Sequence, residues 1–468
     1  MPKDPSSSQA DPRRLSLLQA ICLNMSMMVG IGPFLTIPLL VGRMQGSNAL
    51  WIWAVGAVVA IADGLVWSEL AAAFPGSGGT YHFYDSVYGN RWDGRLLKFL
   101  FIWQFLFSAP LELASGAIGG MKYVSAIFAE GHLFDPIAKV GFGALGTWSI
   151  SSGNLASMSV MVTGVLMAYR RVGAAGRMMV MLWLGMIATV AWITITGFMH
   201  FDPVRITGSA RPWRLDPKGL RDASIGLGLA MYTYLGYYQV CYLADEVDTP
   251  SRTIPRSILA SVVIVAAMYL AMNTSLLGWM DWDSLATDGG AISGRMGAVY
   301  GKWAAYLVTG LIAWTALAGT FAAMVSYARV PYAAARAGHF FGGLAALHPR
   351  GGFPHRSLLV VGAAAILACL ADLETVISAL MASRILIQFV GQIATVAYIR
   401  TRPELRDRMS FRMWLYPLPA LVALVGWFFI FAASDVLTLA YGLGSMVAGG
   451  LVFLVWDRRG RKPATLEV

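Results

Sequence analysis

The chain has little charge for its length. Only 13% of its 468 residues are charged, while 57% are hydrophobic. Soluble domains carry about 25% charged residues, so the composition excludes an ordinary soluble protein. Lipid is the expected main solvent, and we predict a membrane protein.

Cysteine and histidine are also scarce. Cys22, Cys241 and Cys369 each fall in an apolar stretch and show no paired spacing, which disfavours a disulfide framework and a thiolate metal site. A membrane-embedded enzyme would need convergent nucleophiles, bases or metal ligands. No two histidines form an i, i+4 pair, and all six lie in predicted loops or at span ends. They are His82, His132, His200, His339, His348 and His355. We therefore expect neither catalytic nor metal-binding residues.

The formal net charge of +10 does not indicate a nucleic-acid partner. Such a partner requires a clustered basic face with base-reading or stacking elements, and here the cations lie between apolar runs. Residues 1–14 are polar and basic and lack the short apolar stretch and cleavage site of a signal peptide. We expect the first apolar run to remain in the protein as a span.

Apolar runs of about 20 residues can cross the hydrocarbon of a bilayer as helices. We predict roughly twelve of them. Their ranges are 16–42, 48–73, 96–121, 148–169, 176–198, 222–243, 257–280, 302–328, 356–372, 375–399, 413–433 and 436–456. The stretch 122–147 is rich in glycine and could hold a short extra helix, and residues 279–302, with Asp281, Asp283 and Asp288, are expected to form a polar external loop.

Lys and Arg residues concentrate in alternate connections between these runs, which sets the orientation by the positive-inside rule. We expect both termini to be cytoplasmic, in an integral multi-pass protein of the bacterial cytoplasmic (inner) membrane. The main exception is the external loop 199–221, which holds Arg205, Arg211, Arg214, Lys218 and Arg221.

Two spans are interrupted at matching places, at Gly30-Ile31-Gly32-Pro33 and around Thr233 to Gly236. Non-helical backbone inside a bilayer survives only where it is buried in protein or lines a cavity. A pair of interrupted spans in corresponding halves indicates a binding site near the middle of the membrane. Close helix packing through small residues is the alternative explanation for these glycines.

Four motifs, in order along the chain, resemble the amino acid-polyamine-organocation (APC) superfamily. The first is the Gly30-Ile31-Gly32 break. Ser68-Glu69-Leu70, followed by Phe74-Pro75-Gly76-Ser77-Gly78-Gly79-Thr80-Tyr81, is similar to that family's "AEL…P-x-SGG-x-Y" segment. Leu235-Gly236-Tyr237, leading to Glu246-Val247-Asp248-Thr249-Pro250-Ser251-Arg252-Thr253-Ile254-Pro255-Arg256, resembles its "E-V-x-N-P-x-R-x-I-P-R" signature. Tyr327-Ala328-Arg329 to Ala333-Ala334-Ala335-Arg336 resembles the end of its eighth helix.

The resemblance implies an all-α LeuT-like fold, in which two five-helix repeats of inverted orientation are followed by two further helices. It also implies alternating access around unwound first and sixth helices. The implied parts are a cytoplasmic tail 1–15, repeats 16–198 and 222–400 joined by an external loop 199–221, helices eleven and twelve in 401–456, and a tail 457–468.

We expect the substrate to bind at these breaks. Glycine allows close approach to the main chain, and the amides that begin the following half-helix suit a carboxylate. In the sixth span, freed carbonyls suit an ammonium group, and Tyr232 occupies the place of an aromatic gate in the family. Two residues depart from the family pattern. Ile31 stands where the family often has a small polar residue, and Pro33 removes a backbone amide. The predicted substrate residues are Val29, Gly30, Ile31, Gly32, Tyr232, Thr233, Tyr234, Leu235, Gly236, Gln104 and Ser108.

Charged residues inside spans are costly and indicate function by default. Glu112, on one face with Gln104 and Ser108, is a candidate proton or cation site, or else the structural partner of Lys122 or Arg384. Arg384 begins a polar stripe with Gln388 and Gln392. We favour a role for this stripe in tying helices together over a role in an external vestibule.

Glu69 and Glu246 are expected to form cytoplasmic gating networks with arginines such as Arg95, Arg252 and Arg329. Some proton-coupled relatives carry a lysine on the fifth helix, but residues 178–198 hold no charge. Coupling is then left to Glu112, to a sodium site or to plain exchange. We expect no cofactor apart from a coupling H⁺ or Na⁺.

The sequence therefore predicts a secondary transporter for an amino acid or a related small amine. A polyamine or organocation transporter, and a transport-silent sensor of the same fold, are the alternatives. The expected partners are the small-molecule substrate and the lipid bilayer, without nucleic acid.

Overall fold

A computed structural model describes residues 15–30, 32–128, 132–141, 147–170, 175–212, 214, 216–287, 290–349, 351–432, 434 and 436–458. Two residues named above, Ile31 and Asp288, lie outside these ranges.

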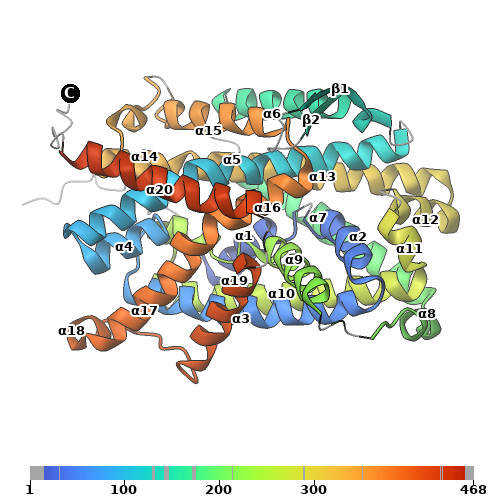
Figure 1. Cartoon of the computed structure of the whole chain (residues 1–468), viewed down its shortest axis with the longest axis horizontal. Helices are drawn as coiled ribbons and strands as arrows, with labels where there is room; N and C mark the ends of the chain where they lie inside the picture. Colours follow the sequence, from blue (N-terminus) through green and yellow to red (C-terminus); the bar gives the residue numbers. More distant parts are fainter. Residues whose placement is uncertain are drawn as a thin grey trace, which may run out of the picture.

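The described part is dominated by helices, and the longest run side by side along the long axis of the molecule (Figure 1). Long helices are α3 (Asn48–Ala73), α5 (Trp92–Phe128), α6 (Ser152–Arg170), α7 (Ala175–Met199), α10 (Pro250–Trp279), α13 (Lys302–Tyr327) and α20 (Val436–Arg458). Shorter helices are α1 (Leu17–Met28), α2 (Gly32–Met44), α9 (Pro217–Tyr234), α15 (His355–Ala368), α16 (Leu373–Arg384), α17 (Gly391–Thr401) and α19 (Leu418–Ala432).

Smaller elements lie between the long ones. They are α4 (Thr80–Tyr88), α8 (Pro203–Gly208), α11 (Trp282–Thr287), α12 (Ala291–Tyr300), α14 (Arg329–Arg336) and α18 (Pro403–Arg406), the 3₁₀ turns η1 (His132–Phe134), η3 (Gln239–Glu246) and η4 (Gly342–Ala345), and the π-helical turn η5 (Ile385–Val390).

Each predicted span coincides with one or more of these helices. Among the described residues, six helices are long and apolar enough to cross a membrane, or seven if the bent pair α1 and α2 counts as one span. The chain is thus a helical membrane protein, and the count of twelve spans and the inverted repeat stay predictions.

Two connections differ from the expectation. Helix α5 continues to Phe128, and the only helical element after it in the described residues of this stretch is the short 3₁₀ turn η1. Instead β1 (Pro136–Gly141) pairs antiparallel with β2 (Thr147–Ser151), because the β-branched and aromatic residues of these segments favour strands. The polar loop 279–302 contains two short helices, α11 and α12.

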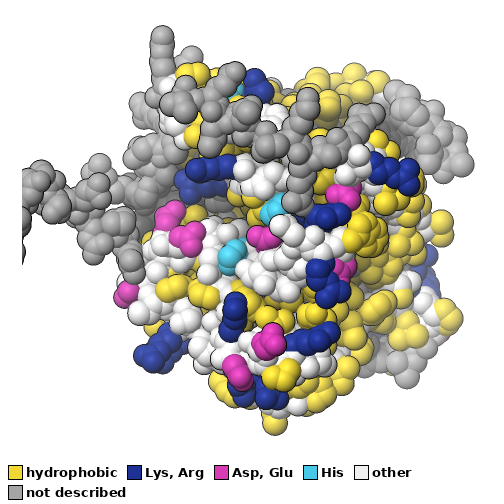
Figure 2. Space-filling model, turned by 90° about the vertical axis from the view of Figure 1, so that its left-hand side faces the viewer, with side chains coloured by type: hydrophobic (Ala, Val, Ile, Leu, Met, Phe, Trp, Pro, Cys, Tyr) yellow, Lys and Arg dark blue, Asp and Glu magenta, His cyan; other side chains and the backbone are white. Residues whose placement is uncertain are grey.

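The sides of the molecule expose large apolar side chains, which are matched to lipid and not to water. Examples are Trp51, Val55 and Val58 of α3, Trp303 and Trp314 of α13, and Val447, Leu451 and Val455 of α20. Basic and acidic side chains gather instead on the end that carries α4, α14 and α18 (Figure 2). This is the end predicted to be cytoplasmic.

Candidate functional site

The first predicted break is present between α1 and α2. Helix α1 ends at Met28, Val29 has the non-helical angles φ −86° and ψ 47°, and α2 begins at Gly32. The two helices are bent by 47° relative to each other. Pro33 occupies the second residue of α2, where a helix has no use for the missing N–H.

The second break follows α9. This helix ends at Tyr234, Leu235 is extended with φ −56° and ψ 143°, and the chain continues in η3. Gly236 has φ +112°, and a Cβ atom at this position would lie 2.8 Å from the Cβ of Met27. Only glycine satisfies both conditions, so Gly236 lets the two interrupted segments touch.

Further contacts join the two breaks. A Cβ atom at Gly32 would lie 2.7 Å from Cγ2 of Thr233, and the hydroxyls of Thr36 and Thr233 are 3.3 Å apart. The Tyr269 hydroxyl of α10 donates to the carbonyl oxygen of Met28 at 2.7 Å and also approaches that of Thr233 at 3.3 Å. Tyr269 was not predicted, because a single tyrosine in an apolar run is typical of packing.

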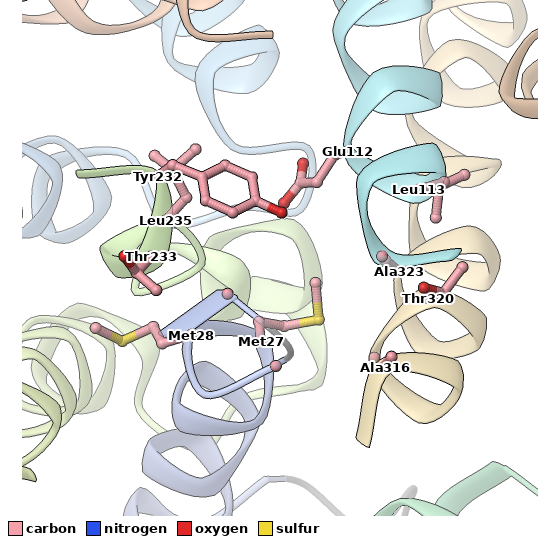
Figure 3. A pocket seen from close by; sticks show the side chains of 14 residues that line it. Met27, Met28, Glu112, Leu113, Tyr232, Thr233, Leu235, Ala316, Thr320 and Ala323 are labelled. Atoms are coloured by element: carbon pink, nitrogen blue, oxygen red, sulfur yellow. The ribbon is translucent and has the colours of Figure 1, made fainter. Parts of the chain in front are cut away.

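A cavity of about 60 Å³ lies where the two breaks face α5 and α13 (Figure 3). It is lined by Met27, Met28, Gly30 and Gly32 from the first break, Tyr232, Thr233 and Leu235 from the second, Glu112, Leu113 and Gly116 from α5, and Ala316, Gly319, Thr320 and Ala323 from α13. The cavity therefore contains both helix breaks and one charged group.

That charged group, Glu112, is paired. Its Oε2 accepts from Nη2 of Arg384 at 2.6 Å and from the hydroxyl of Tyr327 at 2.7 Å. Lys122, the other predicted partner, lies instead over the ring of Phe134. Glu112 thus lines the cavity and is the partner of a buried cation, Arg384. Its role as a proton or cation site stays a prediction.

Arg384 joins three elements. Its Nε donates to Oγ of Ser108 at 3.2 Å, and its Nη1 approaches the Tyr238 hydroxyl at 3.4 Å. The residue is only 1% exposed, so it ties helices together and does not face an open vestibule. Gln388, in η5, and Gln104, on α5, are buried outside the cavity lining.

The other predicted site residues divide into two groups. Tyr232 lines the cavity, its hydroxyl lies 2.7 Å from Oγ of Ser115, and its ring projects toward Glu112 (Figure 3). Tyr234 points away into an aromatic cluster with Trp53 and Tyr269. Val29, Gly236 and Ser108 shape or support the cavity without lining it.

A family model described as amino acid permease matches residues 15–453. The chain belongs to the amino acid permease family. An uncharacterized transporter of Mycobacterium tuberculosis is 29% identical over 77% of this chain and 75% of the relative. Cationic amino acid transporter 4 of Homo sapiens is 26% identical over 80% of this chain and 58% of the relative. A serine/threonine exchanger of Bacillus subtilis is 23% identical over 93% and 94% of the two chains.

The acidic residues near the predicted cytoplasmic end of this permease have partners that were only partly expected. Both oxygens of Glu69 bind Arg400 at 2.7 Å, and Oε2 also accepts from the amide of Met413. Arg95, Arg252 and Arg329 are therefore not its partners, because the end of α17 brings Arg400 against α3. Arg95 binds Asp457 instead.

Glu246 lies 3.8 Å from Arg329, as one of the expected pairs. Arg252 is exposed and makes no ion pair within the described residues. Beside Glu246 and Arg329 the permease has a wide cavity of about 620 Å³, which Tyr242 also lines.

At the opposite end Arg43 of α2 binds Glu374 of α16 and lies 3.7 Å from Asp222 of α9, next to a cavity of about 300 Å³.

One buried acidic residue of the permease was not predicted from the sequence. Asp63 of α3 is completely buried, its Oδ2 accepts from the Tyr237 hydroxyl, and its Oδ1 accepts from Nε1 of Trp427 at 3.1 Å. The signal was available, since Asp63 is a charged residue in the middle of the predicted span 48–73.

Proposed function

We propose that this permease is a secondary active transporter that moves an amino acid or a related small amine across the membrane by alternating access. The observation that carries the proposal is the cavity at which the two interrupted segments meet. It is lined by Met27, Met28, Gly30 and Gly32 on one side and by Tyr232, Thr233 and Leu235 on the other. The family and the transporters among its relatives support it.

In this proposal the main chain recognises the substrate. The amides at the start of α2, beginning at Gly32, would bind the carboxylate, since a helix N-terminus carries free N–H groups and a partial positive charge. Pro33 reduces the number of these donors. Carbonyls between Thr233 and Gly236 would accept from the ammonium group, and Tyr232 would close over the bound substrate.

The charge of the cavity favours a substrate without a cationic side chain. The carboxylate of Glu112 already binds Arg384 and Tyr327, so the pair presents almost no net charge. A second cationic group would have to displace Arg384 from a buried salt bridge. Serine and threonine, the amino acids named for one of the relatives, have the required character.

We extend the proposal to the architecture. Twelve spans, two inverted repeats over 16–198 and 222–400 and two final helices would place both breaks at equivalent positions. Both termini would face the cytoplasm, across the inner membrane of a bacterium. A coupling ion, H⁺ or Na⁺, would drive accumulation.

Uptake by proteoliposomes tests the proposal, with a labelled panel of amino acids and polyamines. The decisive variant is Gly319→Leu, because a Cβ atom at Gly319 would face the Cα of Gly30 across the cavity at 4.0 Å. Its matched control is Gly310→Leu on the same helix, where a Cβ atom would meet nothing within 4 Å. We expect Gly319→Leu to reduce uptake at least tenfold and Gly310→Leu to leave it unchanged.

Equal uptake by the two variants would refute the cavity as the binding site. Uptake of polyamines in place of amino acids would support the cation transporter. Ligand binding without any uptake would support the sensor.

A further inference from the structure

The carboxylate of Asp63 has no ion-pair partner among the described residues. Within the described residues no Lys, Arg or His nitrogen is within 4.0 Å of its carboxylate. The segment after α9 presents Tyr237 and Tyr238, and α19 presents Trp427, which stacks on Phe389 of η5 at 3.9 Å. Helix α10 presents Ile258 and Val262 to the adjacent Gly64.

These groups bear on the protonation state of Asp63. An ionised carboxylate buried without a counterion is strongly unfavourable. Two neutral donors offset part of this cost, so neither form is favoured overwhelmingly. Each oxygen accepts one hydrogen bond, and a proton needs no additional space at this completely buried carboxylate.

Asp63 also contacts the second helix break, where the substrate is proposed to bind. Tyr237, whose hydroxyl it binds, follows Gly236 directly and is two residues from Leu235, which lines the cavity. One helical turn further along α3, Trp67 stacks on Tyr238 at 4.3 Å with an interplanar angle of 8°. Asp63 and Trp67 thus hold both tyrosines of the second break against α3.

The contacts continue to the substrate cavity. The hydroxyl of Tyr238 lies 3.4 Å from Arg384, and Arg384 binds Glu112 in the cavity wall. A shift of the segment 235–238 on substrate binding would therefore separate Tyr237 from Asp63. Water would then reach the carboxylate and favour its ionised form.

We propose that Asp63 is a proton-binding site, and that its protonation is coupled to the position of the segment 235–238. Asp63 takes its proton from water on one side and returns it to water on the other. No other bond changes. By linkage, a segment position that alters proton affinity is itself altered by protonation. The inference rests on the proposed transport function and assigns its coupling ion.

Asp63→Asn tests the proposal, because asparagine keeps the size and removes the titration. Proteoliposomes containing the wild type should accumulate substrate at least tenfold more under an acid-outside gradient than without one. Asp63→Asn should lose this stimulation and retain exchange of labelled for unlabelled substrate. The surface variant Asp93→Asn should behave like the wild type.

An infrared titration provides a readout that does not depend on transport. The wild type should show a carbonyl band of a protonated carboxylic acid that is missing in Asp63→Asn. Tyr237→Phe, which removes one donor to the carboxylate, should move the midpoint of that band to higher pH, and it replaces Asp63→Asn if the latter does not fold.

Three results would each overturn the proton site. They are gradient-driven accumulation by Asp63→Asn, a wild type that is insensitive to the gradient, and a wild type that lacks the assigned infrared band. A wild type that exchanges no substrate overturns the transport function instead. The infrared band then decides the proton site alone.

Discussion

At the scale of single residues, the salt bridge between Glu112 and Arg384 determines the charge of the cavity. Arg384 is buried, and the side chain of Glu112 is 17% exposed. Buried pairs contribute little net stability, but removal of one partner leaves an uncompensated charge. Loss of one ion is therefore expected to lower the free energy of unfolding more than loss of both ions together.

We predict that Glu112→Gln and Arg384→Gln each destabilise the protein by about 3 kcal/mol. The double variant should recover a large part of this loss, because it buries no unpaired charge. Unfolding in detergent measures the three values as a double-mutant cycle. Additive losses would contradict the pairing.

At the scale of elements, the two interrupted helices pack closely at Gly236 because this residue has no side chain. Gly236 combines φ +112° with close contact to the Cβ and carbonyl carbon of Met27. A methyl group there must strain the backbone and push the first break away. The break of α9 and the break before α2 are in this sense one structural unit.

We predict that Gly236→Ala destabilises the protein by about 2 kcal/mol, from the strained backbone angle and the contact with Met27. The control is Gly185→Ala in α7, where a Cβ atom would meet nothing within 4 Å. That substitution should be neutral or stabilise by up to about 1 kcal/mol. Similar destabilisation by both variants would refute the packing role of Gly236.

At the scale of the whole molecule, the two ends differ. Beside Glu246 the cavity measures about 620 Å³, and beside Arg43 it measures about 300 Å³. Arg43 binds Glu374 and approaches Asp222, which joins α2, α9 and α16 at the predicted external end. The cavity at the predicted cytoplasmic end is thus the larger of the two, and ion pairs lie beside both cavities.

We predict that Glu374→Gln shifts the population toward an externally open state. Partly exposed ion pairs contribute about 1 kcal/mol or less, which limits the shift to about fivefold. A cysteine introduced at Ser378, which lines the external cavity, should react correspondingly faster with an impermeant maleimide once Cys22, Cys241 and Cys369 are replaced. Glu404→Gln in α18 is the control, and an unchanged rate for Glu374→Gln would exclude a closing role for the pair.

The sequence was sufficient for the helical fold and for the position of both breaks, since lipid leaves a strong hydropathy signal and glycine marks the interruptions. Side-chain partners were less predictable. Glu69 binds Arg400, 331 residues away along the chain, and only the packing of α17 on α3 brings the two together. Tyr269 was missed because its role depends on the carbonyl groups that neighbouring segments present to it. Asp63, in contrast, carried a readable signal as a charged residue inside a predicted span.

Tyr269 has a consequence for the timing of the two breaks. Its hydroxyl bonds the carbonyl of Met28 and lies close to that of Thr233, so neither segment shifts without disturbing the same phenol. In the proposed transport cycle, opening one segment before the other had closed would let solute pass down its gradient without coupling. Because the two segments share one hydroxyl, they would move together, which protects against such uncoupled passage.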